Sequence, residues 1–128
     1  MPLSFDRKDY PYEYRQNRSN TYPIEQEDFQ KKEAFLSIVK QCVENDIAFY
    51  IVFPPNFQEH SYAFEKRLRD LASGGVQFIV HDTTNEIYQD KAFFYDHNHL
   101  KVNGAKIFTK EVIEVLKQEQ ALRNLDKP

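Results

Sequence analysis

Cysteine and glycine are scarce in this sequence. Of the 128 residues, one is a cysteine and three are glycines. The single cysteine, Cys42, excludes an intramolecular disulfide and a zinc site made of several thiolates. Because Cys42 falls on a predicted helix among apolar neighbours, we interpret it as a small buried side chain.

The sequence also lacks a large excess of charge of either sign, and it lacks long apolar runs. The formal net charge is -3, and no stretch concentrates Lys and Arg, which argues against a nucleic-acid-binding surface. No apolar run approaches the length of a membrane span, and the first residues do not read as a secretory signal. We therefore expect a chain that is soluble as written, without a membrane segment, and its compartment stays open.

The length suits one domain, and 41% hydrophobic residues are enough for a core. We divide the chain into an irregular arm (residues 1–23), an α/β domain (24–118) and a polar tail (119–128). The arm mixes tyrosines and prolines without a helical or strand period. Either it lies over the domain, or its tyrosines cover a surface of another chain or of a missing segment.

The domain alternates helices with apolar strands. The period of its apolar residues predicts helices over about 26–45, 58–72 and from about 105 to 116, and strands over 47–53 and 76–80. The run 47–53 is apolar at every position, which is typical of a parallel strand covered on both faces. The order predicts a three-layer α/β/α fold with a parallel sheet, flavodoxin-like in class.

Two strands are too few for such a fold. A two-stranded parallel sheet is not stable alone, and its open edges would invite pairing. We expect the missing strands to come from an absent N-terminal half, from the arm or from a second copy of the chain. The unfinished sheet edges therefore predict a homo-oligomer as one option.

The chemistry concentrates in the segment 92–105, which reads as a loop before the last helix. Asp96 and His99 stand three residues apart, and a tight turn can bring both to one edge of a sheet. A carboxylate that binds one imidazole nitrogen fixes the tautomer, so the other nitrogen can take a proton from a hydroxyl. This is the general-base half of a nucleophilic hydrolase.

The run Phe94-Tyr95-Asp96-His97-Asn98-His99-Leu100, followed by Gly104-Ala105, resembles the C-terminal Asp-x-x-His block of the SGNH (GDSL-type) hydrolases. The likeness covers roughly 21–116 in pattern and about a dozen residues of specific motif. It implies an SGNH-like fold, with Asp96 as the orienting carboxylate and His99 as the base. It also implies an ester substrate, often an O-acyl group on a carbohydrate or lipid, and no metal or organic cofactor.

The sequence departs from that family at the nucleophile. The family carries a serine in a Gly-Asp-Ser block near the start of the domain, whereas this chain has no such block and its first glycine is Gly74. Lys101 stands where the family usually has Asn. We expect the C-terminal portion of an esterase or acyltransferase, inactive alone. The alternative is a non-catalytic interaction or assembly domain on the same scaffold.

Two other interpretations of the histidines remain open at this point. Asp96 and His99 could form a structural hydrogen bond only. A metal site could use Asp96, His97 and His99, with His81 and Asp82, although no ligand spacing supports it. His60 and His97 are expected to be solvated.

Overall fold

The computed structural model describes residues 12–16 and 21–125, and it has a mixed α/β architecture. Within these residues the chain forms three α-helices, four short strands and short 3-10 turns. The helices are α1 (Phe29–Glu44), α2 (Tyr62–Ala72) and α3 (Val102–Leu125), and the strands are β1 (Tyr50–Phe53), β2 (Gln77–Val80), β3 (Phe94–Asp96) and β4 (His99–Leu100). The predicted order of helices and apolar strands is confirmed.

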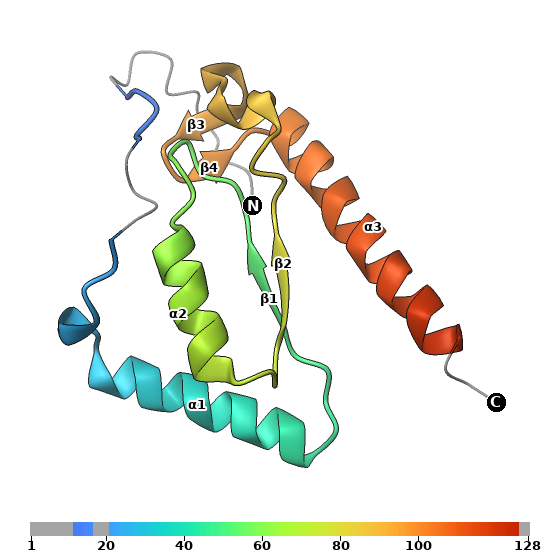
Figure 1. The fold of residues 1–128 in the computed structure, drawn as a ribbon. Coiled ribbons are helices and arrows are strands. Elements are labelled where there is room, and N and C mark those ends of the chain that lie inside the picture. The colour runs from blue at the N-terminus through green and yellow to red at the C-terminus, as the bar shows by residue number, and fades with distance from the viewer. Residues whose placement is uncertain (1–11, 17–20, 126–128) are drawn as a thin grey trace.

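The strands form two small sheets. β1 and β2 pair in parallel, in a register that runs from Tyr50 opposite Gln77 to Phe53 opposite Val80. β3 and β4 form an antiparallel hairpin at the carboxyl ends of β1 and β2 (Figure 1). The parallel pairing agrees with the sequence prediction, whereas the segment predicted as a loop contains this hairpin.

The first strand is shorter and less covered than its composition predicts. It begins at Tyr50, while Ile47 is 58% exposed and Val52, within the strand, is 40% exposed. Among the described residues β1 pairs with β2 alone, so its other edge and part of one face lack the neighbours that a central strand has. The prediction of a strand covered on both faces is therefore wrong for the part of the chain that the structure describes.

The helices begin and end at residues with the expected capping chemistry. The Asp28 side chain accepts a hydrogen bond from the backbone N–H of Lys31, and Ser61 caps α2 by accepting from Phe64. α2 ends where Ser73 and Gly74 adopt positive φ angles of 50° and 84°. The glycine-containing end predicted for this helix is confirmed.

A bidentate ion pair joins the segment before α1 to α2. Arg67 donates from Nε and Nη2 to the two carboxylate oxygens of Glu27, at 2.7 and 2.8 Å. This hydrogen bonding lowers the pKa of the Glu27 carboxyl to about 2. The pair ties the segment before α1 to the middle of α2.

The buried side chains form two separate clusters. One lies between α1, α2 and the parallel strands and centres on Val39, Ala72 and Val76. The other lies under the hairpin and centres on Tyr12, Phe57, Tyr88 and Phe94. Tyr12 belongs to the predicted arm, so this part of the arm, residues 12–16, lies over the domain. Residues 1–11 and 17–20 of the arm are outside the described residues.

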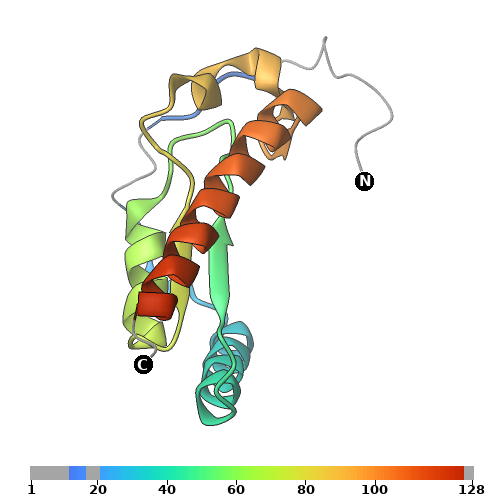
Figure 2. The ribbon, with the colours of Figure 1, turned by 90° about the vertical axis from the view of Figure 1, so that its right-hand side faces the viewer.

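Helix α3 is longer than predicted. It continues past Leu116 to Leu125, and it flanks the parallel strands on the side opposite α2 (Figures 1 and 2). The Tyr50 hydroxyl donates to Glu119 at 2.6 Å and accepts from Arg123 at 3.2 Å, and these contacts hold the additional turns against β1.

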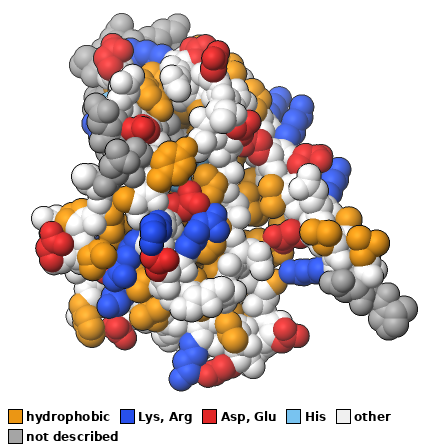
Figure 3. Space-filling view, viewed as in Figure 1, with side chains coloured by type: hydrophobic (Ala, Val, Ile, Leu, Met, Phe, Trp, Pro, Cys, Tyr) orange, Lys and Arg blue, Asp and Glu red, His pale blue; other side chains and the backbone are white. Residues whose placement is uncertain are grey.

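The surface carries mixed charge and some apolar side chains. On the face shown in Figure 3, Lys and Arg alternate with Asp and Glu, and hydrophobic side chains gather near the end of α3, where Leu122 and Leu125 are exposed. None of the described helices combines the length and the apolar character that crossing a membrane requires.

Candidate functional site

The hairpin of β3 and β4 brings Asp96 and His99 together. One oxygen of the Asp96 carboxylate, Oδ1, accepts from the backbone N–H of Asn98 and from Nδ1 of His99, each at 2.8 Å. An Asp side chain that bonds the backbone two residues later stabilises a tight turn. The three-residue spacing therefore produces the carboxylate–imidazole contact that the sequence predicts.

Burial separates the roles of the two side chains. The Asp96 side chain is 11% exposed and that of His99 is 58% exposed. The buried carboxylate can only accept, so Nδ1 of His99 carries a proton and Nε2 has the lone pair in the neutral ring. Within the described part of the chain Nε2 forms no hydrogen bond, so it is available to a group outside the hairpin.

Segments distant in the sequence hold the hairpin in place. Phe57 donates its backbone N–H to the carbonyl of His97 at 2.8 Å, and the Tyr12 hydroxyl donates to the carbonyl of Phe94 at 2.8 Å. The ring of His97 contacts the carbonyl of Glu13 through Nε2 at 2.9 Å.

Of the residues of the metal alternative, Asp96 and His99 are in contact, but His81 and His97 bond elsewhere. Nδ1 of His81 lies 3.0 Å from the carbonyl of Phe53, and His97 faces Glu13. Across the described residues, no group of three or more His, Cys, Asp and Glu side chains is placed to hold a metal ion.

A second group of titratable side chains lies at the carboxyl ends of β1 and β2. Nε2 of His60 is 2.7 Å from Glu65, and the rings of His60 and His81 are 5.3 Å apart, edge to face. The prediction that His60 is solvated is wrong, because its side chain is 7% exposed. His60 is buried against the rings of Phe53 and Tyr62.

The electrostatics of this group differ from those of isolated side chains. Burial raises the pKa of the Glu65 carboxyl, but hydrogen bonds from His60 and Arg69 outweigh burial and hold that pKa below its ordinary value. Burial lowers the pKa of the His81 imidazole and outweighs the opposing hydrogen bond with Phe53. The fold therefore favours a charged Glu65 and a neutral His81.

The sequence contains a signal for the His60–Glu65 pair that composition alone does not reveal. With Ser61 as the N-cap of α2, His60 is the residue before the cap and Glu65 is the fourth residue of the helix. These are the two positions that a hydrophobic staple brings into contact. Here the contact is polar, and reading the cap from the sequence would have predicted it.

Comparison of the chain with family models, with curated proteins and with solved structures gives no match. The resemblance to SGNH hydrolases therefore rests on the residues of the hairpin and of the first turn of α3.

Proposed function

We propose that this chain supplies the Asp–His base of an SGNH-type serine esterase or acyltransferase that acts on O-acyl esters. The contact between Nδ1 of His99 and Oδ1 of Asp96 at 2.8 Å, with the carboxylate buried and the ring exposed, carries this proposal. A hydrolase base needs one nitrogen held by a carboxylate and the other open to the nucleophile.

In this proposal Asp96 orients the imidazole and stabilises its charged form. The bond from Asn98 to the same oxygen fixes the carboxylate, which in turn fixes the plane of the His99 ring. Nε2 of His99 takes the proton of a serine hydroxyl as that oxygen attacks the ester carbonyl, and it later gives the proton to the leaving alkoxide.

The nucleophile and the oxyanion donors come, in this proposal, from residues outside these 128. The sequence has no Gly-Asp-Ser block, and Nε2 of His99 is open within the described residues. The proposed complete domain is a three-layer α/β/α sandwich whose further strands pair with the open edge of β1. That edge is unoccupied among the described strands.

The first test of the proposal uses p-nitrophenyl acetate with this chain alone and with any longer product of its reading frame that contains Gly-Asp-Ser. We expect the chain alone to be inactive and the longer protein to turn over the ester. His99→Ala or Asp96→Asn should lower kcat of the longer protein by roughly 10⁴-fold, because the base is lost or held in the wrong tautomer.

His97→Ala is the matched control, since His97 lies in the same turn and its ring faces Glu13. It should retain most of the activity. Ester hydrolysis that survives His99→Ala would show that another group is the base, and the assignment of Asp96 and His99 would be wrong.

The alternative function is a non-catalytic interaction or assembly domain. Large apolar side chains that are exposed on α1 and α3, including Phe29 at 70% and Leu125 at 79%, favour it. A reading frame without Gly-Asp-Ser, together with partner binding that His99→Ala leaves unchanged, would support this function over the esterase.

A further inference from the structure

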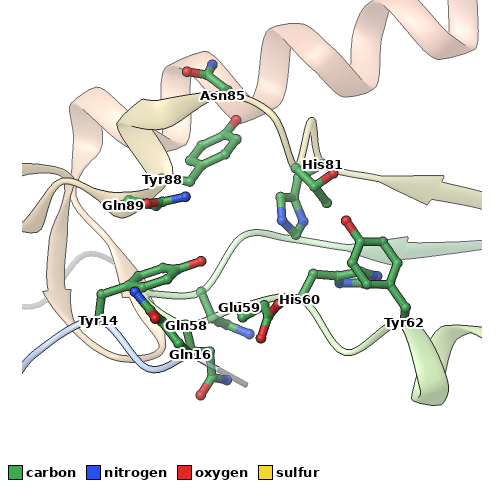
Figure 4. Close-up of a pocket in the computed structure, with 12 residues that line it drawn as sticks. Tyr14, Gln16, Gln58, Glu59, His60, Tyr62, His81, Asn85, Tyr88 and Gln89 are labelled. Atoms are coloured by element: carbon green, nitrogen blue, oxygen red, sulfur yellow. The ribbon is translucent and has the colours of Figure 1, made fainter. Parts of the chain in front are cut away.

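A cavity of about 280 Å³ lies beside the His60–Glu65 pair, at the carboxyl ends of β1 and β2 (Figure 4). Side chains from segments 14–16 and 56–62 face those from segment 81–89 across it. Open parallel sheets bind ligands at this edge. The volume is near the lower end of the range for small-molecule sites. Neither Asp96 nor His99 lines this cavity.

Neutral polar groups dominate the lining. Gln16, Asn56 and Gln89 line the cavity, and their side-chain amides form no hydrogen bond with any described residue. Each amide offers both a donor and an acceptor, which is the combination that a hydroxyl group can satisfy. The rings of Tyr14 and Tyr62 add flat apolar surfaces that can pack against C–H groups.

Two buried imidazoles present one further nitrogen each. The carboxylate of Glu65 and the carbonyl of Phe53 can only accept, so Nε2 of His60 and Nδ1 of His81 carry protons. Nδ1 of His60 and Nε2 of His81 are left for a ligand, and both histidines line the cavity. Their neighbours fix the orientation of both rings, so these nitrogens are pre-organised.

The lining disfavours several other classes of ligand. Its carboxylate, Glu59, adds negative charge and can accept a hydrogen bond from a hydroxyl group. Among the described residues that line the cavity there is no Lys or Arg to neutralise an anion. No group of three ligands is placed for a metal ion in the described part of the chain. An apolar molecule would leave the free amides without partners, at a cost in binding free energy.

We propose that this cavity is a binding site for a small uncharged molecule with several hydroxyl groups, no larger than a monosaccharide. The free amides and the two imidazoles bind its hydroxyls, and the tyrosine rings pack against its C–H groups. The site is separate from the Asp96–His99 pair, so it stands whether or not the chain belongs to an esterase.

The test follows the imidazole NMR signals of His60 and His81 during titration with glycerol, D-glucose and N-acetyl-D-glucosamine. We expect saturable shifts of both signals with at least one of these polyols. Gln89→Ala removes one exposed amide and should weaken binding about fivefold, the effect of one hydrogen bond. Gln118 is likewise an exposed glutamine, on α3, and Gln118→Ala should leave the affinity unchanged.

Inorganic phosphate and Zn²⁺ serve as contrasting probes. Saturation by either one without saturation by a polyol would overturn the proposal, as would the absence of saturation by every probe. His99→Ala should bind the polyol as the natural sequence does. A loss of binding in that variant would place the ligand at the Asp96–His99 pair and would also overturn the proposal. Because ester turnover is measured separately, failure here leaves the esterase proposal intact.

Discussion

Three of the four histidines show how burial assigns different chemistry to one residue type. His99 has an exposed ring held by a buried carboxylate, and His60 is buried against Glu65. His81 is 8% exposed and is held by the carbonyl of Phe53, with His60, Tyr88, Asp82 and Glu111 as its titratable neighbours. The first ring suits proton transfer with a group from outside, whereas the others are fixed within the fold.

The pH dependence of stability should reveal the neutral state of His81. Its pKa is lower in the folded protein than in the unfolded chain, where it is about 6.5. The contribution of the neutral His81 to the free energy of unfolding is fully present above pH 6.5. It is lost as the pH falls toward the folded pKa, because the unfolded chain binds the proton first. The free energy of unfolding should therefore fall between pH 7 and 5, with His81 adding at most about 1.4 kcal/mol per pH unit.

Urea unfolding of the natural sequence and of His81→Asn measures this contribution. Asn has no titrating proton but can still donate to the carbonyl of Phe53. The free energy of unfolding of the variant should therefore change less steeply with pH below pH 6.5. Above pH 7 the dependence of this free energy on pH should be the same for the two proteins. Equal slopes over the whole range would show that His81 has the same pKa in both states.

At the scale of elements, the main feature is the close approach of α3 to the β3–β4 hairpin. A Cβ atom on Gly104 would lie 2.7 Å from Cδ2 of Leu100 and 3.0 Å from the carbonyl oxygen of Phe93. The glycine that follows the Asp-x-x-His block is thus a packing requirement. It allows the first turn of α3 to lie directly on the strand that carries His99.

Gly104→Ala should therefore destabilise the protein. Overpacking costs about 1–3 kcal/mol, and the better helix propensity of alanine returns about 1 kcal/mol. We expect a net loss of about 1 kcal/mol in thermal or urea unfolding. Lys106→Ala, at an exposed position of the same helix, should change stability by less than about 0.5 kcal/mol. A gain in stability for Gly104→Ala would mean that the hairpin moves away without cost.

At the scale of the whole molecule, the described residues form an open structure with two cores. Each core is small, and among the described strands the parallel sheet has an open edge beside β1. Exposed apolar side chains on β1 and on the neighbouring helices would be covered if another strand or another copy paired there.

We predict that the chain self-associates through this edge at high concentration. Val52→Lys places a charge on β1 and removes the apolar area that Val52, 40% exposed, can still bury. That area is worth about 0.6–1.2 kcal/mol, so association should weaken about threefold or more. Thr109→Lys adds the same charge at an exposed position of α3 and is the control. Sedimentation velocity measures both. A strictly monomeric natural sequence would contradict the prediction.

The sequence by itself determined the features that depend on neighbours along the chain. The order of helices and apolar strands follows from apolar periodicity, and the end of α2 follows from Ser73 and Gly74. The Asp96–His99 contact follows from a spacing of three residues in a tight turn. Each of these three features depends only on backbone geometry over a few neighbouring residues.

Only the tertiary structure decided the features that depend on contacts between distant segments. Tyr12 enters the core by bonding Phe94, 82 residues away, and Tyr50 holds the last turns of α3 through Glu119, 69 residues away. The cavity beside His60 has the same origin, because segments 14–16, 56–62 and 81–89 meet there. Periodicity and capping do not predict such contacts between distant segments. These contacts depend on which apolar surfaces of the elements pack against each other.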